Sequence, residues 1–172
     1  MKYKSLGLTV LLAAFAGSAL AQNQVSGTGK CGKPDTSQSI EVGDVAGHML
    51  IIEKDSCTWS VSFEMAGLKS TMYTIAEAVD LTGAKSQDRG YAVITMENGD
   101  KVHLRFQGVS SVKKEGAITG EGTWSYTRGT GKLKGVKGKG TYKASRAPDG
   151  ASEVQLEGEY SLPEAGATAK KK

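Results

Sequence analysis

Residues 101–107, with the sequence KVHLRFQ, alternate strictly between apolar and polar side chains. Val102, Leu104 and Phe106 fall on one face, and the polar residues fall on the other. Because successive side chains of a β-strand point to opposite faces, the pattern predicts a strand with one face in a core and the other in solvent. This stretch therefore indicates an all-β fold.

A second apolar run, residues 91–96, precedes this strand and is separated from it by residues 97–100, ENGD. The Asn98-Gly99 pair suits the positive φ angles of a type I′ turn. We therefore expect residues 91–96 and 101–107 to pair as an antiparallel hairpin.

Three later stretches show the same alternation. In residues 118–126, Gly120, Gly122, Trp124 and Tyr126 share one face, and inward glycines beside large aromatic residues are typical of a tightly curved sheet or small barrel. Residues 137–144 and 153–160 flank a turn at 147–150, with lysines on the outer face of one strand and glutamates on that of the other. A second hairpin supported by facing opposite charges is expected.

Further strands are expected near residues 25–30, 37–42, 48–54, 58–65 and 71–79. Residues 74–78 could instead form a helical turn. Nine or ten short strands joined by turns are typical of a barrel or a sandwich. We predict an antiparallel barrel of about eight strands, and a sandwich with the same alternation is the alternative.

The N-terminus has the features of a signal peptide. Residues 1–4, MKYK, carry two lysines and precede an apolar run at 6–15 and the sequence ALA at 19–21, so cleavage is expected after Ala21. Removal of two lysines lowers the formal net charge of +4 by two, which leaves a nearly balanced surface and no basis for nucleic-acid binding. We expect a signal peptide at 1–21, a barrel domain at 22–162, a disordered basic tail at 163–172, no membrane span in the mature protein, and a periplasmic or secreted location.

Cys31 and Cys57 are the two cysteines of the chain. Both lie in the exported part, where thiols are oxidised, so a disulfide between them is expected. In the chain-entropy model it would stabilise the fold by about 3 kcal/mol. His48 and His103 lack further nitrogen or sulfur ligands nearby, so we expect no metal site. Catalytic and cofactor-binding motifs are also missing from the sequence, and we expect no cofactor.

The glycine-rich stretch 128–138, RGTGKLKGVKG, invites comparison with a phosphate-binding loop. A Walker loop needs Ser or Thr after its Gly-Lys pair, whereas Leu133 follows Lys132 here. The flanking segments are also expected to be antiparallel strands and not a βαβ unit. The stretch therefore predicts a structured, glycine-dependent connection.

Residues 124–133, WSYTRGTGKL, followed by Gly135 and Gly138, resemble the Gly-Gly-Thr-Gly-Lys-Phe type motif of dirigent proteins and the Gly-Gly-Ser-Gly motif of allene oxide cyclases. Arg128 stands where these families usually have the first glycine, and Leu133 replaces phenylalanine. The resemblance covers about residues 90–160. It implies an eight-stranded antiparallel barrel with an apolar cavity, as in an exported bacterial member of this superfamily. The cavity residues of those families lie outside the matched motif, so their activities are not carried over.

The inward faces of the expected strands supply the candidate lining of a cavity. Val61 has the same phase as Trp59 and Phe63 in their expected strand, so it is also expected to point inward. Aromatic side chains inside a small barrel commonly fill the core, and this is the alternative to a role in ligand binding. Glu77 and Asp80 could act as an acid or base if buried, although unpaired acids are mostly exposed. The ligand-binding candidates are Trp59, Phe63, Tyr73, Glu77, Trp124, Tyr126 and Tyr142.

Three classes of function remain open. The first hypothesis is a non-catalytic exported barrel that binds a small apolar molecule in its cavity or a partner at its rim. The second is a cofactor-free cyclase or dirigent-like enzyme acting on a lipid or phenolic substrate, and the third is a structural envelope protein. A perturbed carboxylate such as Glu77 inside an apolar cavity would favour the enzyme. The polar outward faces suit a monomer as well as an oligomer, so the oligomeric state stays open.

Overall fold

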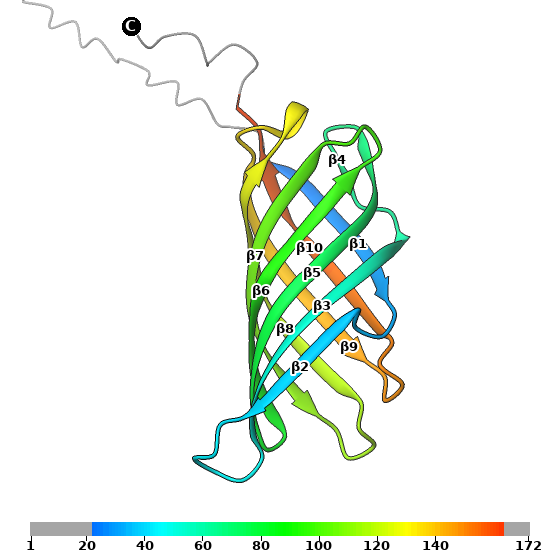
Figure 1. The fold of residues 1–172 in the computed structure, drawn as a ribbon. Helices are drawn as coiled ribbons and strands as arrows, with labels where there is room; N and C mark the ends of the chain where they lie inside the picture. The colour runs from blue at the N-terminus through cyan, green and yellow to red at the C-terminus, as the bar shows by residue number, and fades with distance from the viewer. Residues whose placement is uncertain (1–21, 164–172) are drawn as a thin grey trace, which may run out of the picture.

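The computed structural model describes residues 22–163 and has an all-β fold (Figure 1). The predicted signal peptide, and the predicted tail beyond Pro163, lie outside these residues. Within residues 22–163 the model has no α-helix and one 3₁₀ turn, η1 (Gly131–Leu133). The described part of the chain therefore has no helix that could cross a membrane. The strands are β1 (Asn23–Cys31), β2 (Thr36–Glu41), β3 (His48–Val61), β4 (Glu64–Met65), β5 (Leu68–Thr82), β6 (Lys85–Met96), β7 (Lys101–Val112), β8 (Ile118–Gly129), β9 (Lys137–Arg146) and β10 (Ser152–Ser161).

Eight strands close into an antiparallel barrel. Their order around the wall is β3, β1, β10, β9, β8, β7, β6 and β5, and β5 pairs back with β3. This closure confirms the barrel and excludes the sandwich. β1 and β2 share one edge of β3: β1 pairs with residues 57–61 of β3, and β2 pairs with residues 49–54. β2 is exposed along its whole length and stands outside the eight-stranded ring.

Several strands are longer than the sequence pattern predicts. Residues 48–54 and 58–61, which we expected in two strands, belong to the single strand β3. Residues 74–78 lie inside β5, so the helical alternative is wrong. β6 begins six residues before residue 91, and β7 continues to Val112. The added parts of β6 and β7 do not follow the apolar pattern because serine, aspartate and glycine occupy most of their inward positions.

The hairpin between β6 and β7 is present, but its predicted turn type is wrong. Gly99 has a φ of 84°, while Asn98 does not have a positive φ. The Gly99 amide donates to the Met96 carbonyl and the Met96 amide donates to the Asp100 carbonyl, so this loop needs the left-handed conformation only at Gly99. A pair of consecutive positive φ angles, as in a type I′ turn, occurs instead at Ala66 (52°) and Gly67 (74°), between β4 and β5.

A β-bulge moves Val61 to the outer surface. Gly29 of β1 pairs with Trp59 of β3, and the preceding residue, Thr28, pairs with Val61. One step along β1 therefore matches two steps along β3, and the alternation shifts by one residue at Ser60. Trp59 stays on the inner face, whereas Val61 is 58% exposed, which corrects the expectation that it points inward.

β9 and β10 form the predicted hairpin, with fewer facing charges than expected. Their register places Lys139 opposite Glu159 but Lys143 opposite Gln155. Among the described residues, the ion pairs within 4.0 Å include none between these two strands. Charge pairing is therefore a minor support for this hairpin.

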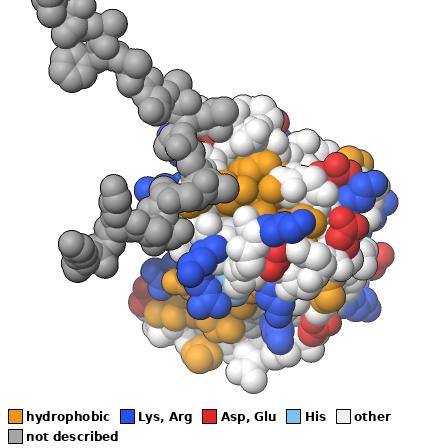
Figure 2. Space-filling model, turned by 90° about the horizontal axis from the view of Figure 1, so that it is seen from above, with side chains coloured by type: hydrophobic (Ala, Val, Ile, Leu, Met, Phe, Trp, Pro, Cys, Tyr) orange, Lys and Arg blue, Asp and Glu red, His pale blue; other side chains and the backbone are white. Residues whose placement is uncertain are grey.

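Apolar side chains fill the end of the barrel where the β6–β7 and β8–β9 connections lie, which we call the closed end. The glycine-rich stretch contributes Leu133, which is 0% exposed, and the Lys132 amide donates to Asp100 Oδ2 at 3.0 Å. It is thus a structured connection, as predicted. Figure 2 looks onto this end, where apolar side chains reach the surface among lysines and arginines. The fully buried side chains here include Phe63, Met65, Met96, Val102 and Leu133.

Cys31 and Cys57 form the predicted disulfide. They are directly paired residues of β1 and β3, with Cα atoms 4.3 Å apart, and they form the last pair between these strands. A protein disulfide of this kind indicates an oxidising, non-cytoplasmic compartment. The bond lies where β1 leaves β3, at the seam with the fewest residue pairs among the neighbouring strands of the ring.

Candidate functional site

The barrel encloses a cavity of about 210 Å³. Its lining reaches Leu81, Ser86, Val112 and Ser152, residues at or next to the β5–β6, β7–β8 and β9–β10 turns. We call this the open end of the barrel. Toward the closed end the walls are apolar and largely aromatic, and the residues that form them include Trp59, Tyr73, Ile75, Phe106, Trp124 and Tyr142.

Glycines on neighbouring strands make room for these aromatic walls. A Cβ atom at Gly140 or Gly158 would lie 2.5 or 2.4 Å from Trp124 Cζ2, closer than real Cβ contacts. The Trp124 indole lies against both glycines, and its Nε1 donates to the carbonyls of Thr141 (3.1 Å) and Glu157 (3.2 Å). Gly140 and Gly158, two of the inward glycines predicted from the alternation, therefore leave the space that the Trp124 side chain occupies.

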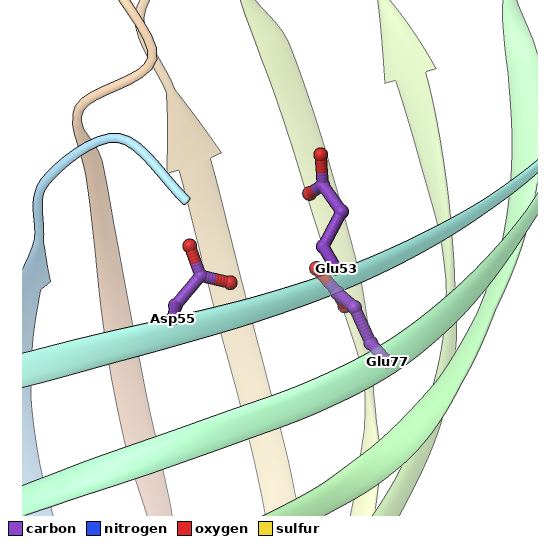
Figure 3. A group of neighbouring side chains, drawn as sticks. All are labelled: Glu53, Asp55 and Glu77. Carbon is purple, nitrogen blue, oxygen red and sulfur yellow. The ribbon is translucent and has the colours of Figure 1, made fainter. Parts of the chain in front are cut away.

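A cluster of charged side chains occupies the polar part of the cavity. Glu53 and Asp55 project inward from β3, and Glu77 projects from β5 directly opposite Glu53 in the strand register (Figure 3). Arg146, near the end of β9, reaches all three: its Nη1 lies 2.6 Å from Glu53 Oε2, and its Nη2 lies 3.8 Å from both Asp55 Oδ2 and Glu77 Oε1. We call these four residues the acid cluster.

Burial changes the protonation of the acid cluster. It raises the pKa of Glu77 to about 7, although the nearby Arg146 guanidinium acts in the opposite direction. Burial also raises the pKa of Asp55. Close to neutral pH, Glu77 therefore exchanges between a protonated form that can donate a hydrogen bond and a carboxylate that can accept one.

A second polar group lies next to the acid cluster. Asp88 of β6 accepts hydrogen bonds from Ser86 Oγ at 2.7 Å and from Ser110 Oγ of β7. Its negative charge contributes to the raised pKa of Glu77. All three residues line the cavity. They are the polar inward residues in the parts of β6 and β7 that extend beyond the predicted strands.

The acid cluster contains ligand atoms that hard metal ions prefer. One oxygen each from Glu53, Asp55 and Glu77 lies within 4.8 Å of the others, and carboxylate oxygens are the ligands typical of Ca²⁺ and Mg²⁺. The Arg146 guanidinium contacts the same three carboxyl groups, however. A metal ion would have to displace this cation or share the space with it.

The structure places five of the seven sequence-predicted ligand candidates in the cavity wall: Trp59, Tyr73, Glu77, Trp124 and Tyr142. The other two lie outside the lining. Phe63 is fully buried and stacks on Trp59, with ring centroids 5.2 Å apart, and Tyr126 packs beside Trp124 at 4.8 Å.

The two acids considered from the sequence have different surroundings. Glu77 faces inward with its side chain 17% exposed, which corrects the expectation that it is exposed. Asp80 lies at the surface, where it contacts His48 Nε2 at 2.9 Å. The sequence pattern did not predict four other site residues, Glu53, Asp55, Asp88 and Arg146. The inward position of Glu53 and Asp55 could have been found from the alternation, because every second residue of β3 from Ile51 to Trp59 faces inward.

Comparison with known proteins adds no functional assignment. No protein-family description matches the chain, and a search of curated proteins found no match. The cavity and its side chains therefore carry the functional argument.

Proposed function

We propose that this protein is an exported barrel that binds a small, largely apolar molecule in its cavity. The observation that carries the proposal is the combination of aromatic walls with a few converging polar groups, which is typical of ligand sites. The aromatic walls would hold the body of the ligand, and the acid cluster would fix its orientation.

The size of the cavity limits the ligand. An apolar cavity of roughly 150 Å³ accommodates benzene. A cavity of about 210 Å³ therefore suits a single ring with a short substituent, or an aliphatic chain of similar volume. Larger ligands would extend through the open end.

Two sequence features support export and the use of the cavity. The features of residues 1–21 support cleavage after Ala21 and a periplasmic or secreted protein, in agreement with the oxidised Cys31–Cys57 pair. The resemblance of residues 124–133 to dirigent proteins and allene oxide cyclases, which act within a barrel cavity, supports binding at this place. The closed eight-stranded barrel agrees with that resemblance.

Glu77 favours a second candidate function, cofactor-free acid–base catalysis on the bound molecule. A general acid or base works best when its pKa lies near the working pH, and burial raises the pKa of Glu77 to about 7. Glu77 lines the cavity, so a bound substrate would lie beside it. A cyclase or dirigent-like reaction on a lipid or phenolic substrate would use it as the proton donor or acceptor.

Native mass spectrometry of the mature protein, purified from its own source without reducing agent, tests the binding proposal. We expect a reproducible added mass that organic solvent removes. The variant Ala144→Phe places a large side chain in the cavity wall and should have the bare mass, whereas Ala147→Phe, in the exposed β9–β10 turn, should keep the ligand. A bare wild-type mass would contradict a tightly bound ligand and favour a structural envelope role.

A further inference from the structure

Negative groups outnumber positive groups in the acid cluster. Three carboxyl groups face one guanidinium, and Asp88 adds another acid nearby. A single proton on Glu77 still leaves Glu53 and Asp55 to share the charge of Arg146. Buried charges are costly unless they are paired, so the cavity is complementary to a further positive group.

One oxygen atom shows where that positive group would bind. Asp55 is 2% exposed, and its Oδ1 is buried with no hydrogen-bond partner among residues 22–163. A buried acceptor without a donor costs about 1–3 kcal/mol, and more when it is charged. Asp55 lines the cavity and its Oδ2 faces Arg146, so a donor carried by the ligand would give Oδ1 the partner that the described residues do not supply.

We infer that the ligand is an apolar molecule with a protonated amine, whose ammonium group binds Asp55 Oδ1 and Glu77 while its apolar body lies against Trp59 and Tyr73. This inference rests on the proposed function and names the ligand class. The ring centroids of Trp59 and Tyr73 lie 4.5 Å apart, and both residues line the cavity, two inward positions along their strands from Asp55 and Glu77. Aromatic faces attract cations and also pack against apolar groups, so these walls suit both the ammonium group and the apolar body of the ligand.

The same site disfavours two other ligand classes. A carboxylate ligand would meet three acids, and Arg146, its one cationic partner in the cluster, is already 2.6 Å from Glu53. A divalent metal ion would have to displace the Arg146 guanidinium or share the space with it, and it would leave the aromatic walls without a role. An ammonium group needs only one or two of the carboxylates and uses both halves of the cavity.

Isothermal titration calorimetry with three phenyl probes of similar size tests the inference. The probes are 2-phenylethylamine, 2-phenylethanol and phenylacetate, which are cationic, neutral and anionic near pH 8. The amine should bind about tenfold tighter than the alcohol or more, because charge-assisted hydrogen bonds are stronger than neutral ones, and phenylacetate should bind weakest.

Substitutions show which residue causes the preference for the amine over the alcohol. Asp55→Asn should lower the affinity for the amine to that for the alcohol and leave the alcohol unchanged. Glu115→Gln, which removes one negative charge from an exposed turn, should keep the preference. If Asp55→Asn does not fold, Glu77→Gln should also reduce the preference for the amine.

The outcomes separate the two proposals. Equal affinity for amine and alcohol would overturn the amine inference and leave the proposed function intact. No binding of any probe, together with a bare mass of the native protein, would overturn both. Binding of Ca²⁺ without binding of the amine would overturn the inference in favour of a metal site.

Discussion

Replacement of Glu77 by Gln should change how the stability of this protein depends on pH. Glu77 is buried in the cavity wall, where burial raises its pKa from 4.5 to about 7. The folded protein therefore holds this proton more tightly than the unfolded chain does. Between these two pKa values the unfolded chain releases its proton first, so the free energy of unfolding falls as pH rises. Glutamine carries no titratable proton and removes this dependence.

The structure sets the size of the effect. Each pKa unit corresponds to about 1.4 kcal/mol, so a rise from 4.5 to about 7 makes Glu77 cost about 3 kcal/mol above pH 7. The same relation gives about 1 kcal/mol at about pH 5, and almost none well below the unfolded pKa. Between about pH 5 and about pH 8, Glu77→Gln should therefore gain about 2 kcal/mol of stability relative to the wild type.

Urea denaturation at several pH values measures this difference directly. The difference between Glu77→Gln and the wild type cancels the contribution of the titratable groups that do not interact with Glu77. Glu115→Gln, in an exposed turn, is the matched control, and its difference from the wild type should stay constant with pH. Parallel curves for Glu77→Gln and the wild type would refute the argument that Glu77 is buried with a raised pKa.

Three further predictions follow from other parts of the fold. Replacing Cys31 and Cys57 by Ser opens a loop closed across 26 residues and should lower the free energy of unfolding by about 3–4 kcal/mol under non-reducing conditions; unchanged stability would argue against a role of the bond at this seam. Gly158→Ala places a Cβ 2.4 Å from Trp124 Cζ2 and should cost about 1–3 kcal/mol and shift the tryptophan fluorescence, whereas Gly32→Ala, with nothing within 4 Å, should change neither; similar behaviour of both variants would contradict the packing. Hydrogen bonds to Asp44 and Asp80 raise the pKa of His48. The stabilisation of the folded protein by these hydrogen bonds should therefore be complete below pH 6.5, and it should be lost as pH rises through the higher pKa of His48 in the folded state. Titration of the two histidines by NMR should show His48 above 6.5 and His103, whose pKa is lowered by burial, below it; the reverse order would refute the assignment.

The alternation of side chains was enough to predict an all-β barrel or sandwich, because each long strand has one buried and one exposed face. The pairing of β5 with β3, which closes the barrel, is a contact that alternation within single strands does not reveal. Prediction from alternation failed where inward and outward side chains do not differ in polarity. The first half of β6 has Ser86 and Asp88 on its inner face, so its sequence looks polar throughout although the backbone continues the strand. Val61 was assigned to the wrong face because the bulge at Ser60 depends on the pairing with β1, which a local pattern does not contain.

The candidate site was predicted only in part. The aromatic wall follows from residues in phase with a buried face, which single strands reveal. The acid cluster depends on contacts across the barrel: Arg146 and Glu53 are 93 residues apart and belong to strands that are not neighbours in the sheet. An arginine at the end of a lysine-rich strand, and acids in a mixed strand, resemble ordinary surface residues until the barrel closes around them.

The division of the barrel into a closed and an open end also bears on how such a protein can evolve. Side chains such as Phe63, Met65 and Leu133 pack the closed end, so most substitutions there should cost stability. Positions such as Val79, Val112 and Val154 line the open end of the cavity, where a changed side chain alters the shape offered to a ligand. Natural variants could therefore acquire new ligands at one end while selection for folding acts on the other.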